Sequence, residues 1–355
     1  MFYTLAFFLK NKFPFIFLLV TIVLITGLMT ANQQNMMLNQ SKKINQSIPV
    51  KKKVLGIENT IIASPSATLS PTPLPKGDKR LIKLGIVVDD YRNTTGELST
   101  VQQQLGKPFS TVSIYKQFGL PTNDMISSDD LAYIHTQRSN VLIAWEPWNP
   151  QEGIHQSTDY LQEIMEGKQD TYIKNFAQSV KSYAGPVTIR FGHEMNGDWY
   201  PWGKRPTEYT AAYRRIVLLF KDAGVTNVSW MWSINANPLD NLASYYPGNE
   251  YVDIIGIDGF NFGTTQSRTT WQTFDQIFQP VYNYLTQQYS KPIIISETAS
   301  AEQGGNKPEW IQNMFASMTT KMPQVQEIIW FDLIKETDWR INSTPASFSS
   351  FKSSL

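Results

Sequence analysis

Short apolar runs recur along the chain from Leu81 onward, and each is rich in β-branched side chains. Runs of this length, bounded by turn-forming residues, predict buried β-strands. The strands expected on this basis are Leu84–Asp89, Thr111–Tyr115, Val141–Glu146, Val187–Glu194, Val228–Ser233, Val252–Asp258, Pro292–Glu297 and Glu327–Asp332.

Amphipathic segments lie between these runs. In residues 208–223, Arg214, Arg215 and Lys221 flank the apolar run 216–218. This pattern gives the one-sided apolar face of a helix that packs on the outside of a domain. The helices expected in the same way include Thr171–Tyr183, Glu208–Ala223, Phe274–Tyr289 and Glu309–Lys321.

The alternation of strands and helices indicates the fold class. About eight β/α units in roughly 265 residues match a (β/α)8 TIM barrel in number and length. A doubly wound sheet is the alternative, and it normally has a glycine-rich phosphate loop after its first strand. The first predicted strand here runs into Asp89-Asp90-Tyr91-Arg92 without such a loop. We therefore predict an α/β fold of the (β/α)8 class.

The N-terminal part of the chain differs in composition from this domain. Residues 13–29 are almost purely apolar, which predicts a short membrane helix or a signal-peptide core. The polar segment after it becomes rich in Ser, Thr and Pro, which is typical of an extended linker. The predicted organisation is a signal anchor or signal peptide, a disordered linker, the globular domain and a C-terminal tail, over residues 1–31, 32–80, 81–345 and 346–355.

Lysines lie on both sides of the apolar run. Lys10 and Lys12 precede it, but Lys42 and Lys43 follow it, and the positive-inside rule then argues against export of the C-terminal part. The linker composition favours export. We expect the protein at the extracellular face of the cell membrane, attached through its N-terminal segment, or secreted.

Charge and residue usage exclude several classes of function. The formal net charge of +1 gives no field that would attract nucleic acid. Cysteine is absent, and His135, His155 and His193 are too far apart in the sequence to indicate a metal site. No Gly-x-Ser-x-Gly elbow is present. We expect no metal, no cofactor and a monomer.

Carboxylates and tryptophans gather at the ends of the predicted strands. A barrel brings these C-terminal ends to one rim, and Glu194 on the fourth strand would face Glu297 on the seventh. Two facing carboxyl groups beside aromatic rings are suited to glycoside hydrolysis. A separation of about 5–5.5 Å would indicate a retaining mechanism and ~6.5–9.5 Å an inverting one. Spacing in the sequence does not assign the two roles.

The segment His193–Gly203 (HEMNGDWYPWG) resembles the acid/base motif of glycoside hydrolase family 26, whose members include β-mannanases and β-1,3-1,4-glucanases. The resemblance covers most of residues 81–345. It continues in Trp230–Asn235, Tyr245–Gly248, Asp253–Gly259, Lys291–Glu297, Trp330–Asp332 and Glu336–Arg340.

This resemblance implies a (β/α)8 catalytic domain with the acid/base on the fourth strand and the nucleophile on the seventh. Glu194 would be the general acid/base and Glu297 the nucleophile. The implied activity is that of a retaining endo-β-glycanase acting on a polysaccharide. β-1,4-Mannan is the first expected substrate and β-1,3-1,4-glucan the second, with β-1,3-xylan also open.

Several neighbouring side chains are candidates for substrate binding. Trp199, Trp202 and Trp330 are expected to stack on sugar rings, with Trp330 under the reacting sugar. His193 and Asn196 could each bond either the substrate or the protein, Glu146 is expected in the cleft, and Asp258 is expected to orient loops. One of Trp230 and Trp232 is expected in the core. The complete set is His193, Asn196, Trp199, Trp202, Trp145, Glu146, Trp232, Asp258 and Trp330.

Phe260 departs from the family pattern. Members often have tyrosine there, and its hydroxyl bonds the nucleophile. In this chain that bond must come from another residue, or the nucleophile is less well oriented. The departure keeps a second hypothesis open, a non-catalytic or weakly active barrel that binds polysaccharide at the cell surface.

Overall fold

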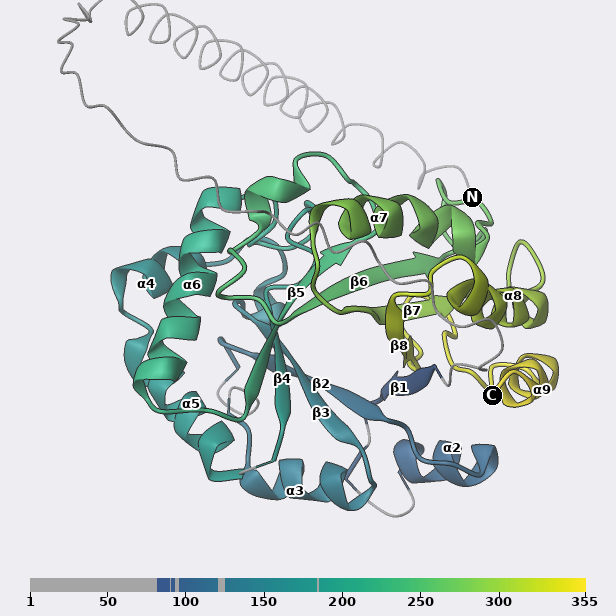
Figure 1. Ribbon diagram of the computed structural model, residues 1–355, viewed down its shortest axis with the longest axis horizontal. Coiled ribbons are helices and arrows are strands. Elements are labelled where there is room, and N and C mark those ends of the chain that lie inside the picture. The colour runs from purple at the N-terminus through teal and green to yellow at the C-terminus, as the bar shows by residue number, and fades with distance from the viewer. Residues whose placement is uncertain (1–81, 90, 93–95, 121–124, 184) are drawn as a thin grey trace, which may run out of the picture. The chain divides into compact units, whose positions relative to one another are not determined.

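A computed structural model describes residues 82–89, 91–92, 96–120, 125–183 and 185–355. Its strands form a closed parallel barrel in chain order (Figure 1). β1 pairs with β8 so that Gly85 lies opposite Ile329, which closes the barrel. The strands are β1 Lys83–Val87, β2 Thr111–Gln117, β3 Asn140–Glu146, β4 Val187–Phe191, β5 Val228–Asn235, β6 Ile254–Asn261, β7 Ile293–Ser300 and β8 Val325–Phe331.

Helices surround the barrel in the described part of the chain (Figure 1). They are α2 Glu97–Leu105, α3 Ser128–Thr136, α4 Tyr160–Glu166, α5 Asp170–Tyr183, α6 Pro206–Asp222, α7 Phe274–Gln288, α8 Lys307–Thr320 and α9 Pro345–Ser353, with short 3-10 turns at η1 Pro150–Glu152 and η2 Leu242–Tyr245. The predicted (β/α)8 class is confirmed, and the expected strands lie within a few residues of the observed ones.

Strand β4 shows how side chains are divided between the two sides of the barrel wall. Phe191 points outward and packs on Tyr209 and Tyr213 of α6. Its neighbour Arg190 points into the barrel, where its side chain is fully buried. Successive residues of a strand face opposite sides of the sheet. An apolar residue next to a polar one can therefore pack against the outer helices while the polar one points into the barrel.

The C-terminal residues belong to the folded domain. Residues 346–355 were expected to be a tail outside it, but most of them lie in α9. Phe351 of α9 is buried and packs edge-on against Trp330 of β8 and Phe315 of α8. The helix therefore covers the barrel wall at β8.

The predicted membrane anchor at residues 1–31 and linker at 32–80 lie outside the described residues. Among the helices that the structure does describe, none is long and apolar enough to cross a membrane.

Candidate active site

Glu194 and Glu297 both lie at the C-terminal end of the barrel and are buried. Glu194 lies in the loop three residues after the end of β4, and Glu297 lies within β7. The pairing of β6 with β7 shifts its register here, so that Ile257 lies opposite Ile295 and the next residue, Asp258, lies opposite Glu297. Such a bulge re-aims side chains. It explains how Ser296 and Glu297, although consecutive, both have partners inside the barrel.

Glu194 has a left-handed backbone conformation with φ of 55°. A non-glycine residue in this region is strained, and such strain is concentrated at functional sites. Its Oε1 accepts a hydrogen bond from Asn235 Nδ2 at 2.7 Å, and its Oε2 accepts one from Trp199 Nε1 at 2.6 Å. Burial, reinforced by the negative charge of Glu297, raises the pKa of Glu194 to about 7. This carboxyl can therefore hold a proton near neutral pH.

Glu297 has different surroundings. The guanidinium of Arg190 and the hydroxyl of Tyr115 both donate to its Oε1. Two donors on one oxygen, one of them a guanidinium, fix the orientation of this carboxyl group. Burial and the neighbouring Glu297 hold the pKa of Tyr115 well above 10, so its hydroxyl stays a donor. The bond that Phe260 cannot provide is thus supplied from β2.

Arg190 and Asp258 form a buried network with Glu297. Nη1 of Arg190 donates to both carboxylate oxygens of Asp258 at 2.9 Å, while its Nη2 contacts Glu297. Ser233 and Ser296 donate to Asp258 at 2.9 and 2.6 Å. Asp258 was a candidate for substrate binding, but it is fully buried under these partners. Its observed contacts orient Arg190, and through Arg190 they orient Glu297.

Gly256 leaves room for this network because it has no side chain. A Cβ built on Gly256 would lie 2.5 Å from Ser296 Oγ and 2.9 Å from Ser233 Oγ. A Cβ atom does not come that close to another heavy atom, so a larger residue at position 256 would push the two hydroxyls away from Asp258.

Glu146 adds a third buried carboxyl at the end of β3. Its Oε2 accepts hydrogen bonds from Gln117 at 2.7 Å and Trp148 at 3.2 Å. Burial raises the pKa of Glu146 to about 7. Its Oε1 lies 3.9 Å from Nε2 of His193, whose pKa burial and Arg190 hold well below 6.5, so the imidazole is neutral. Glu146 also lines the cavity described next.

A cavity of about 680 Å³ opens beside Glu146 and beside Tyr115, the hydroxyl donor to Glu297. Tyr115, Gln117 and Glu146 line it from β2 and β3, and the segment after β8 forms the opposite side. The volume is in the range of pockets that bind small ligands or a few sugar units. Trp199 is 42% exposed while it bonds Glu194, so its ring offers apolar surface next to that carboxyl.

Three predicted sugar-binding tryptophans face the helices instead of the cleft. Trp145 stacks on Phe176 of α5, Trp232 packs against Tyr289 beyond α7, and Trp330 packs against Trp310 and Phe351. All three rings are fully buried. Trp230 also faces outward, onto Phe220 of α6, because residues two apart in a strand share a face. The expectation that Trp330 lies under the reacting sugar is therefore wrong.

Trp202, Asn196 and His193 act mainly within the protein. Trp202 is buried, donates to the backbone oxygen of His193 at 2.7 Å and stacks on Tyr200. The Asn196 side chain bonds the backbone of Asn235 and Pro238, which ties the loop after β4 to the loop after β5. Nε2 of His193 lies 3.2 Å from the Tyr200 hydroxyl. Of the two interpretations for Asn196, the loop tie is the one observed.

Sequence reasoning missed Arg190, Tyr115 and Asn235, which hold the two glutamates. Arg190 carried a recognisable signal, because a lone arginine in the apolar run Val187–Phe191 needs a buried acidic partner. Tyr115 had been placed at a strand end without a role. Within the described part of the chain, no group of three or more His, Cys, Asp or Glu side chains is arranged to hold a metal ion.

Comparison with known proteins bears on this arrangement. Residues 154–297 match the model of glycosyl hydrolase family 26, and this segment includes both Glu194 and Glu297. The chain is related to glycosyl hydrolase family 26. The predicted resemblance to that family is confirmed.

Two relatives match parts of this chain in amino-acid sequence. Endoglucanase H of Acetivibrio thermocellus is 42% identical over 233 residues, which cover 62% of this chain and 25% of that protein. A mannan endo-1,4-beta-mannosidase of Bacillus subtilis (strain 168) is 34% identical over 93 residues, which cover 23% of this chain and 25% of that protein. The matches therefore span about a quarter of the length of each of these relatives.

The barrel also resembles solved structures. The catalytic domain of the Bacillus sp. JAMB-750 GH26 endo-beta-1,4-mannanase superposes with a TM-score of 0.59 at 20% identity, covering 78% of this chain and 85% of that one. At this identity the likeness shows the shared barrel.

Proposed function

We propose that the barrel is a retaining endo-β-glycanase that hydrolyses a β-linked polysaccharide. The observation that carries the proposal is the contrast between two buried carboxyl groups on β4 and β7. Glu194 has a pKa raised to about 7, whereas Glu297 accepts a guanidinium and a hydroxyl donor on one oxygen. Two carboxyl groups whose surroundings differ in this way suit an acid and a nucleophile. The match of residues 154–297 to the model of glycosyl hydrolase family 26 supports the assignment.

The proposed mechanism is double displacement. Glu297 attacks the anomeric carbon while Glu194 gives its proton to the leaving glycosidic oxygen, so a covalent glycosyl-enzyme forms and the shortened chain leaves. Glu194, now ionised, then takes a proton from water, and that water releases the sugar from Glu297. Because both donors hold Oε1 of Glu297, we assign the attack to Oε2.

β-1,4-Mannan is the first proposed substrate and β-1,3-1,4-glucan the second. The mannanase name of several relatives favours the first, and the longer, more identical match to endoglucanase H favours the second. A reducing-sugar assay of the protein on mannan, mixed-linkage β-glucan and β-1,3-xylan separates them. Release of reducing ends from one polysaccharide names the substrate, and release from none of them refutes the proposal.

The configuration of the product tests the mechanism separately. Proton NMR of the first sugars released should show the β-anomer before mutarotation, as retention requires. Initial release of the α-anomer would indicate inversion and would remove Glu297 from the role of nucleophile.

The second hypothesis, a polysaccharide-binding barrel without turnover, rested on Phe260. Tyr115 now provides a hydroxyl donor to Glu297, so the feature that favoured this hypothesis no longer does. We also propose that the apolar run at residues 13–29 directs the protein to the outer face of the membrane or out of the cell.

A further inference from the structure

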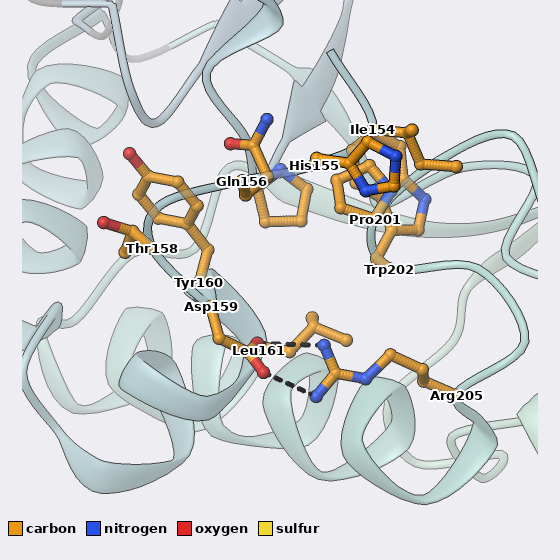
Figure 2. A pocket seen from close by; sticks show the side chains of 11 residues that line it. Ile154, His155, Gln156, Thr158, Asp159, Tyr160, Leu161, Pro201, Trp202 and Arg205 are labelled. Carbon is orange, nitrogen blue, oxygen red and sulfur yellow. Dashed lines mark hydrogen bonds and ion pairs between the residues drawn. The ribbon is translucent and has the colours of Figure 1, made fainter. Parts of the chain in front are cut away.

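A second hollow of about 310 Å³ opens at the same end of the barrel and contains none of the residues assigned above except Trp202. Residues 147–161, after β3, line most of it, and residues 201–205, after β4, complete it (Figure 2). Both segments follow the C-terminal ends of strands, which is the face where the cleft lies, and the first of them runs into the start of α4.

A single aromatic layer separates this hollow from the cleft. Trp202 lines the hollow, whereas Tyr200 and Trp148 line the cleft. The rings of Trp202 and Tyr200 are stacked with centroids 4.3 Å apart, and Trp148 meets Trp202 edge-on at 5.6 Å. The hollow and the cleft therefore share one wall, in which the rings of Trp202 and Tyr200 are stacked.

The lining of the hollow combines apolar surface with polar groups. Figure 2 shows Ile154 and Pro201 on one side and the hydroxyls of Thr158 and Tyr160 on another. Ile154 is 44% exposed, so it presents apolar surface to solvent. This combination suits a ligand with both an apolar face and hydroxyl groups.

The charges of the hollow cancel. Asp159 and Arg205 form a two-pronged ion pair with N···O distances of 2.9 and 2.8 Å, and both side chains remain partly exposed. A paired guanidinium and carboxylate leave no net charge to attract a phosphate, a carboxylate or an amine. Their outer edges still provide donors and acceptors for neighbouring hydroxyls. A neutral sugar fits this chemistry better than an ionic ligand.

We propose that the hollow is an accessory saccharide site that holds a sugar unit of the same polysaccharide chain that occupies the cleft. This inference rests on the proposed function, because it takes the polymer in the cleft as its ligand. The site lengthens the region over which a long chain is held, and short oligosaccharides that fill only the cleft do not reach it.

Ile154→Gln in the full chain tests the site, with Leu218→Gln as the matched control. Leu218 lies on α6, is 45% exposed and is absent from the lining of the hollow, so the control makes the same change at equal exposure. Ile154→Gln should raise KM for the polysaccharide about fivefold, equivalent to ~1 kcal/mol. It should leave kcat, and KM for a tetrasaccharide of the same linkage, unchanged. Equal polymer KM in both variants, or equal effects on polymer and tetrasaccharide, would overturn the inference.

Binding can be measured without turnover, which separates this inference from the proposed function. Native gels that contain mannan or mixed-linkage glucan should retard the wild-type chain and Leu218→Gln alike, and Ile154→Gln less. If retardation depends on Ile154 but no polysaccharide is hydrolysed, the accessory site stands and the proposed function fails. If a polysaccharide is hydrolysed but retardation is absent or insensitive to Ile154, the function stands and the accessory site fails.

Discussion

Replacing Tyr115 by phenylalanine removes one hydroxyl and keeps the ring. That hydroxyl donates to Oε1 of Glu297, beside the guanidinium of Arg190. Its loss should leave the carboxylate paired with Arg190 but freer to rotate about its last torsion angle. The substitution therefore asks whether a donor from β2 orients Glu297 in this chain, where position 260 is a phenylalanine.

The size of the effect follows from the nature of the bond. A hydrogen bond to a charged group contributes about 1.5–3 kcal/mol. If all of this is lost in the transition state, kcat/KM falls about 10- to 150-fold. Arg190 still holds the same oxygen, so we expect a value toward the lower end, about 10- to 30-fold, with most of it in kcat.

Tyr213→Phe is the matched control. Tyr213 is a buried residue of α6, and its hydroxyl has no hydrogen-bond partner within the described part of the chain. Removing it deletes the same atom from the same residue type, outside the site. The assay is the initial rate of reducing-sugar release from the preferred polysaccharide over a range of concentrations, together with the midpoint of thermal unfolding. The control should keep full activity and equal or higher stability, because an unsatisfied buried hydroxyl is unfavourable.

Two results would refute the reasoning. A fall in kcat/KM of less than threefold in Tyr115→Phe would show that the hydroxyl does not orient the nucleophile. An equal fall in Tyr213→Phe would show that the loss comes from the barrel wall and not from the site.

Three further predictions follow from other contacts of the site. kcat/KM should decline as pH rises through about 7, because Glu194 must be protonated to act as the acid. Asn235→Ala removes a donor that lowers the pKa of Glu194, so the decline in kcat/KM should move to higher pH. A shift of this decline to lower pH would contradict the prediction. Arg190→Met should lower the free energy of unfolding by about 3–5 kcal/mol in urea titrations, since it leaves Asp258 and Glu297 buried without their cation. Wild-type stability in this variant would show that the fold does not need the two ion pairs. Trp330→Ala should lower that free energy by about 3–5 kcal/mol and leave KM unchanged, because its ring packs on α8 and α9; a raised KM with normal stability would return Trp330 to the cleft.

The barrel could be predicted from the sequence because its signal is local. Each strand is a short apolar run. The predicted strands Val141–Glu146 and Val228–Ser233 begin within one residue of the observed strands and end within two residues of them. The positions of Glu194 and Glu297 were also within reach, since both end predicted strands on opposite sides of the barrel, whereas their separate roles came only from the resemblance to family 26.

The direction of individual side chains was harder to predict. Trp330 and Trp145 are at strand ends, where a ring can face either the cleft or the helices, and alternation alone does not say which. The bulge at Ser296 is a further example, because it turns two consecutive side chains inward and leaves no mark in the sequence pattern.

Hydrogen-bond partners that are far apart in the sequence also could not be predicted. Tyr115 and Glu297 are 182 residues apart, and Arg190 and Asp258 are 68 apart. No spacing rule connects such pairs before the strands are placed around the barrel. Phe260 indicated that a donor to the nucleophile was needed, but only the closed barrel shows that β2 supplies it.

The central claim is that Glu194 and Glu297 together cleave the glycosidic bond, and turnover by isosteric variants tests it most directly. Reducing-sugar release should be compared for wild type, Glu194→Gln, Glu297→Gln and, as a control, Glu146→Gln, the third buried carboxyl of the cleft. We predict that kcat falls by about 10²–10⁴ or more in each of the first two variants, as expected for loss of a positioned acid/base or nucleophile, and much less in the third. Wild-type-like turnover by either Glu194→Gln or Glu297→Gln, in folded protein, would contradict the account.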